Sequence, residues 1–198
     1  MRNIQHALIM AAGRGQRMMP LTKKIPKAMA SYDGTTLIAS GIEKLKKFIP
    51  NVHITVGYKK AMLAKHVIEH NVSSIFNTEG KGNSWWVFNT LMKQINEPVI
   101  ILTCDNVIEL NIELLTKNYY HHNEPACMVI PVKPIAGLEG DYIFQKNNIV
   151  NELSRTKRSD IYCSGIQIMN PFKINSLLSP ADDFTNLWNE LIQKKQLF

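Results

Sequence analysis

The stretch HALIMAAGRGQRMMPLTKKIPKAM spans His6–Met29 and carries the strongest fold signal in this chain. Its first residues, His6–Ala12, form a continuous apolar run of the kind that becomes a parallel strand buried on both faces. The loop that follows, within Met10–Met29, is rich in glycine, proline and basic residues. Connections in α/β folds normally take about two to six residues. The excess length and the positive charge predict that this loop binds an anionic ligand.

The rest of the N-terminal half alternates between helical and extended patterns. Apolar extended segments are predicted at 52–58, 72–77 and 98–105, and helices at 35–50, 59–70 and 83–95. This order predicts parallel strands joined by right-handed crossovers, with helices on both faces of the sheet.

From Ala126 the pattern changes to short, closely spaced strands, which favour antiparallel additions. We expect strands at 126–132, 141–146, 148–153 and 161–169, followed by helices at 171–178 and 183–195. The predicted fold is therefore α/β, a Rossmann-like three-layer α/β/α arrangement with a mostly parallel central sheet and antiparallel additions in the C-terminal half. The 198 residues predict one domain, 1–198, because the chain is too short for two independent cores.

Charge and cysteine usage restrict the partners and the compartment. The net charge is +7, but the lysine pairs are scattered, so no nucleic-acid partner is expected. Cys104, Cys127 and Cys163 show no CxxC spacing, which argues against disulfides and structural zinc and favours a reducing cytosol. No window approaches about 18 apolar residues, so we expect no membrane partner and a cytoplasmic location. His121 and His122 lie in a loop-like stretch without a third zinc ligand, and are expected at the surface.

The loop has the residue types that phosphate binding needs. Gly13 and Gly15 let the backbone approach a phosphate, and successive N–H groups can form an anion-binding nest. Arg14, Arg17 and Lys27 can add charge-assisted hydrogen bonds to phosphate oxygens.

Two common phosphate motifs do not describe this loop. A P-loop requires GxxxxGK[ST], which is absent from the sequence. A dinucleotide fingerprint requires GxGxxG, but its third glycine would fall at Met18. An ordered loop without a ligand remains the alternative.

The segment AAGRGQRMMPLTKKIPKAM resembles the signature AAGxGxRxxPxTxxxPK of the nucleoside-triphosphate-dependent nucleotidyltransferases. This family includes sugar-1-phosphate nucleotidyltransferases and bacterial choline-phosphate cytidylyltransferases. The matching positions are Ala11, Ala12, Gly13, Gly15, Arg17, Pro20, Thr22, Pro26 and Lys27. The resemblance extends, more weakly, to about Gln193.

The resemblance implies roles for these residues. Nucleotide binding would fall on Ala11, Ala12, Gly13, Arg14 and Gly15, which would wrap the triphosphate. Arg17 and Lys27 would be catalytic, since they would hold the reacting phosphates. Asp105 at the end of the strand at 98–105 would bind Mg²⁺, although it could instead be a turn or cap residue.

The base-reading segment of the family would correspond to IFNTEGKGNSWW. Asn77 and Gly82 match its spacing and would bind the nucleotide. The string Gly82-Asn83-Ser84 departs from the sugar-specific members, and the pair Asp105-Asn106 is more similar to the choline-phosphate cytidylyltransferases. Because of this departure the sequence does not settle which nucleotide is bound, and it favours CTP.

The acceptor-binding segment of the family would correspond to NELSRTKRSDIYCSGIQIM. Lys157 would meet the acceptor phosphate and Gly165 would mark the following strand. Arg155 or Arg158 could serve instead, and a solvated basic loop is the alternative. Trp85, Trp86 and Trp188 could form a cage for a quaternary ammonium group, or belong to the core.

Family members also carry a second metal-binding aspartate near the C-terminus, in a strand that would begin where this chain stops. Asp160, Asp182 or Asp183 could replace it, or the metal could rely on Asp105 and the triphosphate. The sequence could also be shorter than the natural one.

The resemblance implies a Mg²⁺-dependent nucleotidyltransferase. Its partners would be a nucleoside triphosphate, bound by about 1–109, and a phosphorylated acceptor, bound by about 110–198. The acceptor would be a sugar-1-phosphate or a small phosphomonoester such as phosphocholine, and pyrophosphate would be released. A non-catalytic nucleotide-sensing protein on the same fold is the main alternative, and a nucleic-acid-binding module is a third.

Overall fold

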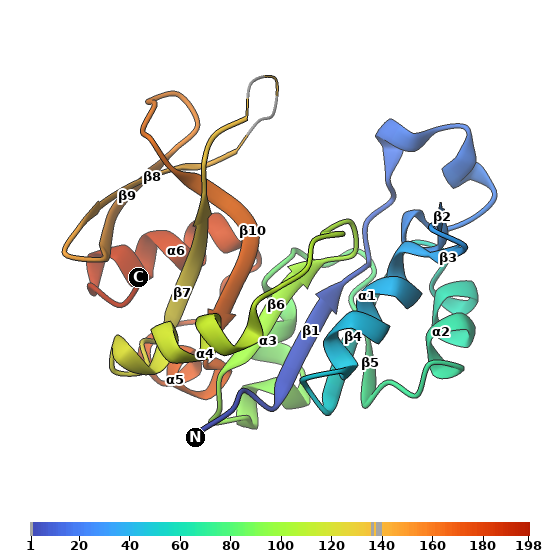
Figure 1. Cartoon of the computed structure of the whole chain (residues 1–198), viewed down its shortest axis with the longest axis horizontal. Helices are drawn as coiled ribbons and strands as arrows, with labels where there is room; N and C mark the ends of the chain where they lie inside the picture. The colour runs from blue at the N-terminus through green and yellow to red at the C-terminus, as the bar shows by residue number, and fades with distance from the viewer. Residues whose placement is uncertain (1, 136, 138–139) are drawn as a thin grey trace.

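An eight-stranded mixed sheet runs through the centre of the protein (Figure 1). The computed structural model describes residues 2–135, 137 and 140–198. The strand order is β5-β4-β1-β6-β10-β8-β9, and β7 pairs with β10 beside this path. The strands are β1 (His6–Met10), β4 (Asn51–Val56), β5 (Ser74–Asn77), β6 (Val99–Thr103), β7 (Cys127–Val132), β8 (Tyr142–Lys146), β9 (Ile149–Ser154) and β10 (Tyr162–Met169).

The sheet changes from parallel to antiparallel pairing along its width. His6 of β1 pairs in parallel register with Asn51 of β4 on one side and with Val99 of β6 on the other. Beyond β6, strand β10 runs antiparallel to both β6 and β7, and the β8–β9 hairpin continues this half. The predicted parallel centre with antiparallel C-terminal additions is confirmed.

Helices cover both faces of the sheet. They are α1 (Leu37–Lys46), α2 (Lys60–Ile68), α3 (Trp85–Asn89), α4 (Ile112–His121), α5 (Pro171–Leu177) and α6 (Phe184–Gln193). The apolar faces of α1, α2 and α4 share one core with the sheet, and those of α3, α5 and α6 share the other. Strand β1 serves both cores, because Ala7 and Ile9 face one and Leu8 faces the other. The three-layer prediction is therefore confirmed.

Two local predictions in the middle of the chain are wrong. The helix expected at 83–95 is two pieces, α3 and a 3-10 turn at Leu91–Gln94, because Thr90 between them is extended with φ −121° and ψ 175°. The stretch around His121 is the end of helix α4, not a loop. His121 is exposed as expected, whereas His122 is half-buried. Sequence inspection missed this helix, which Asn111 caps with its side chain.

The predicted helix at 35–50 also begins with a different element. A small hairpin, β2 (Ser31–Tyr32) and β3 (Thr35–Thr36), precedes α1 and turns at Asp33–Gly34, where both residues have positive φ. This is the Asp-Gly turn chemistry of two-residue hairpins.

The last residues of the chain pair with strands of the C-terminal half. Leu197 forms a parallel bridge with Cys127 of β7, and its carbonyl accepts a hydrogen bond from the Val150 N–H of β9. Within the described residues, no helix is long and apolar enough to cross a membrane.

Candidate active site

The glycine-rich loop starts at the carboxyl end of β1 and is fastened to both neighbouring strands. The Ala11 N–H donates to the carbonyl and hydroxyl oxygens of Thr55, at 3.2 Å each. The Ala12 carbonyl accepts from the Tyr58 N–H at 2.9 Å, and the Met10 carbonyl from the Cys104 N–H at 3.1 Å. The loop therefore leaves the sheet at the edge where ligands bind in open α/β sheets.

The loop then folds back on itself around Gly15. This residue has φ +61°, and a Cβ here would lie 2.7 Å from the Lys27 Cβ, so both backbone and space require glycine. The Thr22 hydroxyl donates to the Gly15 carbonyl at 3.1 Å, and the Tyr58 hydroxyl donates to the Thr22 carbonyl at 2.9 Å. These contacts bring Lys27, twelve residues further along the chain, back to the start of the loop.

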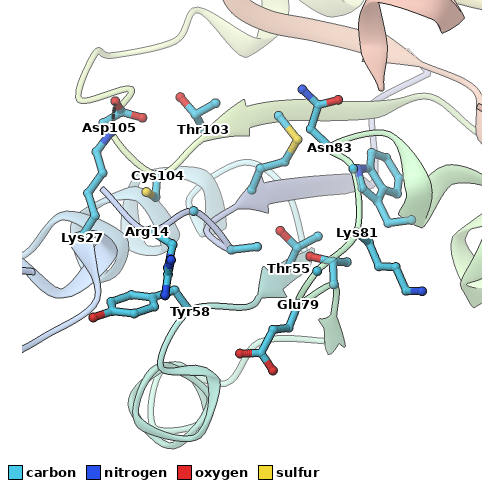
Figure 2. A pocket seen from close by; sticks show the side chains of 17 residues that line it. Arg14, Lys27, Thr55, Tyr58, Glu79, Lys81, Asn83, Thr103, Cys104 and Asp105 are labelled. Carbon is cyan, nitrogen blue, oxygen red and sulfur yellow. Dashed lines mark hydrogen bonds and ion pairs between the residues drawn. The ribbon is translucent and has the colours of Figure 1, made fainter. Parts of the chain in front are cut away.

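A cavity of about 630 Å³ lies over the ends of β4, β1 and β6 (Figure 2). Its walls come from the glycine-rich loop, the strand ends and the segment that leads from β5 into α3. The lining residues are Met10, Ala12, Gly13, Arg14, Lys27, Thr55, Tyr58, Thr78, Glu79, Gly80, Lys81, Gly82, Asn83, Trp86, Thr103, Cys104 and Asp105. In Figure 2, Lys27 and Asp105 lie at one end of the cavity, and Lys81 and Asn83 lie at the other.

Lys27 and Asp105 form an ion pair across this site, with 2.5 Å between Nζ and Oδ2. Their side chains are 28% and 46% exposed. Burial alone would raise the pKa of the Asp105 carboxyl, but the hydrogen bond from Lys27 and its positive charge outweigh it. The pKa of Asp105 is therefore below its ordinary value, and this carboxylate is anionic at neutral pH.

Asn106 holds the end of β6 in place. Its Oδ1 accepts from the Thr103 N–H at 2.8 Å and from the Thr103 hydroxyl at 2.9 Å, and its Nδ2 donates to the Ser164 carbonyl at 3.5 Å. Asn106 thus links the end of β6 to the bulge of β10, where Gly165 has φ +81°. Burial raises the pKa of the neighbouring Cys104 thiol to about 11, so it is not a thiolate nucleophile at neutral pH.

The segment after β5 is fixed by the loop that precedes α6. A Cβ on Gly82 would lie 1.8 Å from the Asp182 carbonyl oxygen, so this close approach of two backbones requires glycine. The Ser84 hydroxyl donates to the Ala181 carbonyl at 2.7 Å, and the Phe184 N–H donates to Asn83 Oδ1 at 2.8 Å. One wall of the cavity is therefore held by residues about a hundred positions away.

The rim of the cavity is basic. The Arg14 guanidinium lies 5.4 Å from the centre of the Tyr58 ring, and the Lys81 ammonium lies 5.4 Å from the Trp85 ring. Lys60 forms an ion pair with Glu79 at 2.8 Å, which neutralises one acidic group of the cavity lining. The arrangement favours a ligand with several negative charges at the Lys27 end.

The sequence matches the profile of the nucleotidyl transferase family over residues 6–137. The chain belongs to this family. Members of the family are enzymes that transfer nucleotidyl groups, and the predicted family is confirmed.

Individual relatives of the nucleotidyl transferase family are distant. The chain is 26% identical to the bifunctional protein GlmU of Methanocaldococcus jannaschii over 163 residues, which cover 81% of this chain and 38% of that protein. It is 23% identical to mannose-1-phosphate guanyltransferase beta-B of Xenopus laevis over an alignment of 211 positions, gaps included, which covers 97% of this chain and 57% of that protein. The chain thus spans less than two thirds of the length of these curated relatives.

Solved structures support the same fold. The CTP:phosphocholine cytidylyltransferase from Streptococcus pneumoniae has a TM-score of 0.75 at 21% identity, over 98% of this chain and 87% of that one. The inositol-1-phosphate CTP transferase from T. maritima has a TM-score of 0.77 at 16% identity, over 100% of this chain and 86% of that one. These likenesses confirm the nucleotidyl transferase fold.

The cavity brings together part of the residue set that the sequence predicted for a nucleotidyl transferase. Of these residues, the ones that line it are Ala12, Gly13, Arg14, Lys27, Gly82 and Asp105. Ala11 and Gly15 lie in the loop without lining the cavity. Arg17 is exposed on the 3-10 turn Gln16–Met18, and makes no hydrogen bond or ion pair to the described residues. Asn77 Oδ1 accepts from the Glu79 N–H at 3.2 Å, so this side chain shapes the turn beside the cavity.

The predicted acceptor residues lie outside this cavity. Lys157 is exposed between β9 and β10, where it pairs with Glu152 at 2.6 Å. Gly165 lies in the β10 bulge, one residue after the carbonyl that Asn106 contacts. In Figure 1, the turn between β9 and β10 and the glycine-rich loop rise from the same side of the sheet.

The candidates for a second metal-binding carboxylate are Asp160, Asp182 and Asp183, and the structure places them elsewhere. The Asp183 side chain caps α6 by accepting from the Asn186 N–H at 2.9 Å. Asp182 meets Gly82 through its backbone, and its side chain and that of Asp160 are exposed. In the described part of the chain, no three His, Cys, Asp or Glu side chains gather as a metal-binding group.

Sequence reasoning missed several lining residues. Thr55, Tyr58 and Thr103 follow or end buried parallel strands, and their position at strand ends was the available signal. For Trp86 the sequence indicates only a cage or a core position. Among the three tryptophans, it alone lines this cavity, whereas Trp188 donates to Gln167 Oε1 at 3.0 Å.

Proposed function

We propose that this chain transfers a nucleoside monophosphate from a nucleoside triphosphate to a phosphorylated small molecule. An oxygen of the acceptor phosphate would attack the α-phosphorus in line. The bond from that phosphorus to the bridging oxygen would break, and pyrophosphate would leave with the electron pair. The observation that carries this proposal is the cavity in which the glycine-rich loop, Lys27 and Asp105 meet at the ends of β1 and β6.

Alignment and charge neutralisation would do most of the catalysis, because neither substrate has to be ionised further. The backbone from Ala11 to Gly15 would cradle the triphosphate, with Arg14 at its side. Lys27 and Arg17 would stabilise charge that develops between the α- and β-phosphates. Lys27 already lies in the cavity, whereas Arg17 would reach the ligand from the exposed turn of the same loop.

Asp105 fits a Mg²⁺ ligand. It is a half-exposed, anionic carboxylate at the edge of the cavity, and Mg²⁺ in proteins takes one or two carboxylates together with phosphate oxygens and water. When bound, the metal would supply positive charge to the phosphates. Lys27 contacts one oxygen of this carboxylate, so Lys27 and a metal would share Asp105 until a triphosphate offers Lys27 another anion.

The acceptor would bind between the cavity and the antiparallel half of the sheet. We propose Lys157 for its phosphate and the β10 bulge at Gly165 as the neighbouring wall. A sugar-1-phosphate or a phosphomonoester such as phosphocholine is the proposed class of acceptor. In this arrangement, about 1–109 serve the nucleotide and about 110–198 the acceptor, within one domain, 1–198.

CTP is the proposed nucleotide. Asn106 directly after Asp105 supports it, since this pair resembles the choline-phosphate cytidylyltransferases. The relatives carry names with other nucleotides, among them mannose-1-phosphate guanyltransferase, so the four triphosphates have to be compared.

The test is pyrophosphate release with CTP, UTP, GTP and ATP against a panel of sugar-1-phosphates and phosphorylated alcohols, with and without Mg²⁺. We expect release with one nucleotide and one class of acceptor, and loss of release with a chelator. Nucleotide binding without turnover across the panel would refute the enzyme and support a nucleotide-sensing protein. No binding at all would refute both.

A further inference from the structure

A groove lies between α1 and α4, on the face of the sheet that these two helices cover. It consists of two adjoining hollows of about 1250 and 280 Å³, and Phe48, Glu109, Leu110 and Ile112 line both of them. In Figure 1, β1 is visible between the two helices. Among the described residues, this α1–α4 groove and the ligand cavity share no lining side chain, so the groove is a separate feature of the surface.

The floor of the α1–α4 groove is apolar. Ile4, Leu45 and Leu102 are buried and line it from below. Two large apolar side chains above this floor are open to water, since Phe48 is 62% exposed and Ile108 is 50% exposed. Apolar surface that gathers in a hollow and is bordered by polar residues is typical of interaction sites in soluble proteins.

The two rims of the groove carry opposite charges. Lys47 at the end of α1 is exposed, and so are Glu109 and Glu113 at the start of α4. In the described part of the chain, none of these three side chains forms a hydrogen bond or an ion pair. Lys44, also on the α1 rim, lies 5.9 Å from the Tyr32 ring. The α1 rim is therefore basic and the facing α4 rim acidic, and both lack partners of opposite charge.

The far end of the groove has mixed charges that already include a pair. Arg2 and Glu124 form an ion pair there at 2.6 Å, and Lys117 is exposed beside them. The unpaired charges of opposite sign are thus concentrated around Phe48, where the two hollows join.

A surface with one basic and one acidic rim is complementary to a second copy of itself. In a two-fold dimer, both copies use the same patch. If the two-fold axis runs along the groove, each basic rim faces the acidic rim of the other copy, and both contacts are attractive. If the axis crossed the groove, like charges would meet, which is unfavourable. The rim charges therefore select one orientation.

We propose that the α1–α4 groove is the interface of a two-fold dimer of this chain. Phe48 of each copy enters the groove of the other, and the basic rim of each copy pairs with the acidic rim of the other. The interface would also cover the segment 106–111, which leaves the ligand cavity directly after Asp105. This proposal does not depend on the proposed function.

Sedimentation velocity of the chain at about 1–100 μM, the range of weak to moderate affinities, tests the dimer. We expect a reversible equilibrium between one chain and two. Phe48→Glu should weaken dimerisation by at least about 30-fold, as expected for an aromatic residue at the centre of an interface. Phe172→Glu is the matched control, because Phe172 is 48% exposed on α5, in the other helical layer. Both variants should keep the wild-type melting temperature.

An exchange of charges tests the orientation. The double variant Lys44→Glu with Lys47→Glu makes both rims acidic, and the double variant Glu109→Lys with Glu113→Lys makes both rims basic. Each double variant alone should dimerise at least about tenfold more weakly than the wild type. Their equimolar mixture should dimerise about as tightly as the wild type, because both rim contacts of the mixed dimer then join opposite charges. Circular dichroism checks that each variant is folded.

Three results would overturn this proposal. One is a wild-type chain that stays monomeric over the whole concentration range, which would leave the groove to a different partner. Another is a dimer that Phe172→Glu dissociates and Phe48→Glu does not. The third is a mixture of the two charge variants that associates no better than either variant alone. None of these results involves nucleotide, so the proposed function stands or falls separately.

Discussion

His53 should make the stability of this protein depend on pH between neutrality and mild acid. The residue lies in β4 and is 7% exposed. Its Nε2 lies 3.0 Å from His6 Nδ1, and its Nδ1 lies 2.7 Å from the Ser74 hydroxyl. Burial, and then the proximity of His6, lower the pKa of His53 from 6.5 to about 4. Burial also lowers the pKa of His6, against the opposing effect of Glu97.

The direction of this pH dependence follows from the protons that the folded and the unfolded chain bind. Below pH 6.5 the unfolded chain protonates His53 while the folded chain does not, so stability is complete above about 6.5 and is lost as the pH falls toward about 4. A shift of this size corresponds to about 3 kcal/mol in total, at about 1.4 kcal/mol per pH unit. Between about pH 7.5 and pH 5, linkage gives a loss of about 2 kcal/mol in the free energy of unfolding.

Urea denaturation followed by circular dichroism at these two pH values would measure the effect. His53→Gln retains an amide that can bond to Ser74 but does not titrate, so most of the loss on acidification should disappear. His121→Gln, at the exposed end of α4, is the control and should keep the wild-type loss. If His53→Gln and the wild-type protein lose the same free energy, His53 does not resist protonation in the folded state, and the reasoning is wrong.

The site gives three further predictions. Asp105→Asn should abolish the response of turnover to added Mg²⁺ while leaving the melting temperature nearly unchanged, since an exposed ion pair contributes about 0–1 kcal/mol. Lys27→Ala should lower kcat/KM by about 100- to 1000-fold, because it removes a charge partner of the transferring phosphate. Gly82→Ala should destabilise the protein by about 1–3 kcal/mol in urea, because its methyl group would press on the Asp182 carbonyl.

Each of these predictions has its own control. Near-normal turnover of Lys27→Ala, or an undiminished Mg²⁺ response of Asp105→Asn, would remove the role assigned to that residue. For Gly82, the matched variant is Gly13→Ala, where a Cβ would meet no atom within 4 Å. Equal stability of the two glycine variants would show that the contact of Gly82 with Asp182 can relax freely.

Local sequence was sufficient for the elements with strong periodicity or strong turn chemistry. The apolar runs at β1 and β6 predicted buried parallel strands, and the two strands do pair in parallel. Helix α4 escaped notice because its buried positions, Ile112, Thr116 and Tyr119, include a threonine and carry a weak apolar pattern. The break at Thr90 is visible only in the structure, where the Thr90 side chain accepts from the Met92 N–H and starts a separate turn.

The sequence alone was enough for the family of this protein, its fold class and the loop that forms one end of its cavity. Those features depend on residues close together in the chain, whose spacing sets the backbone conformation directly. Only the tertiary structure decided which distant groups meet: Lys27 with Asp105, Gly82 with Asp182, and the rims of α1 and α4 along one groove. The physical reason is that these contacts arise from the packing of whole strands and helices, which the local spacing of residues does not specify.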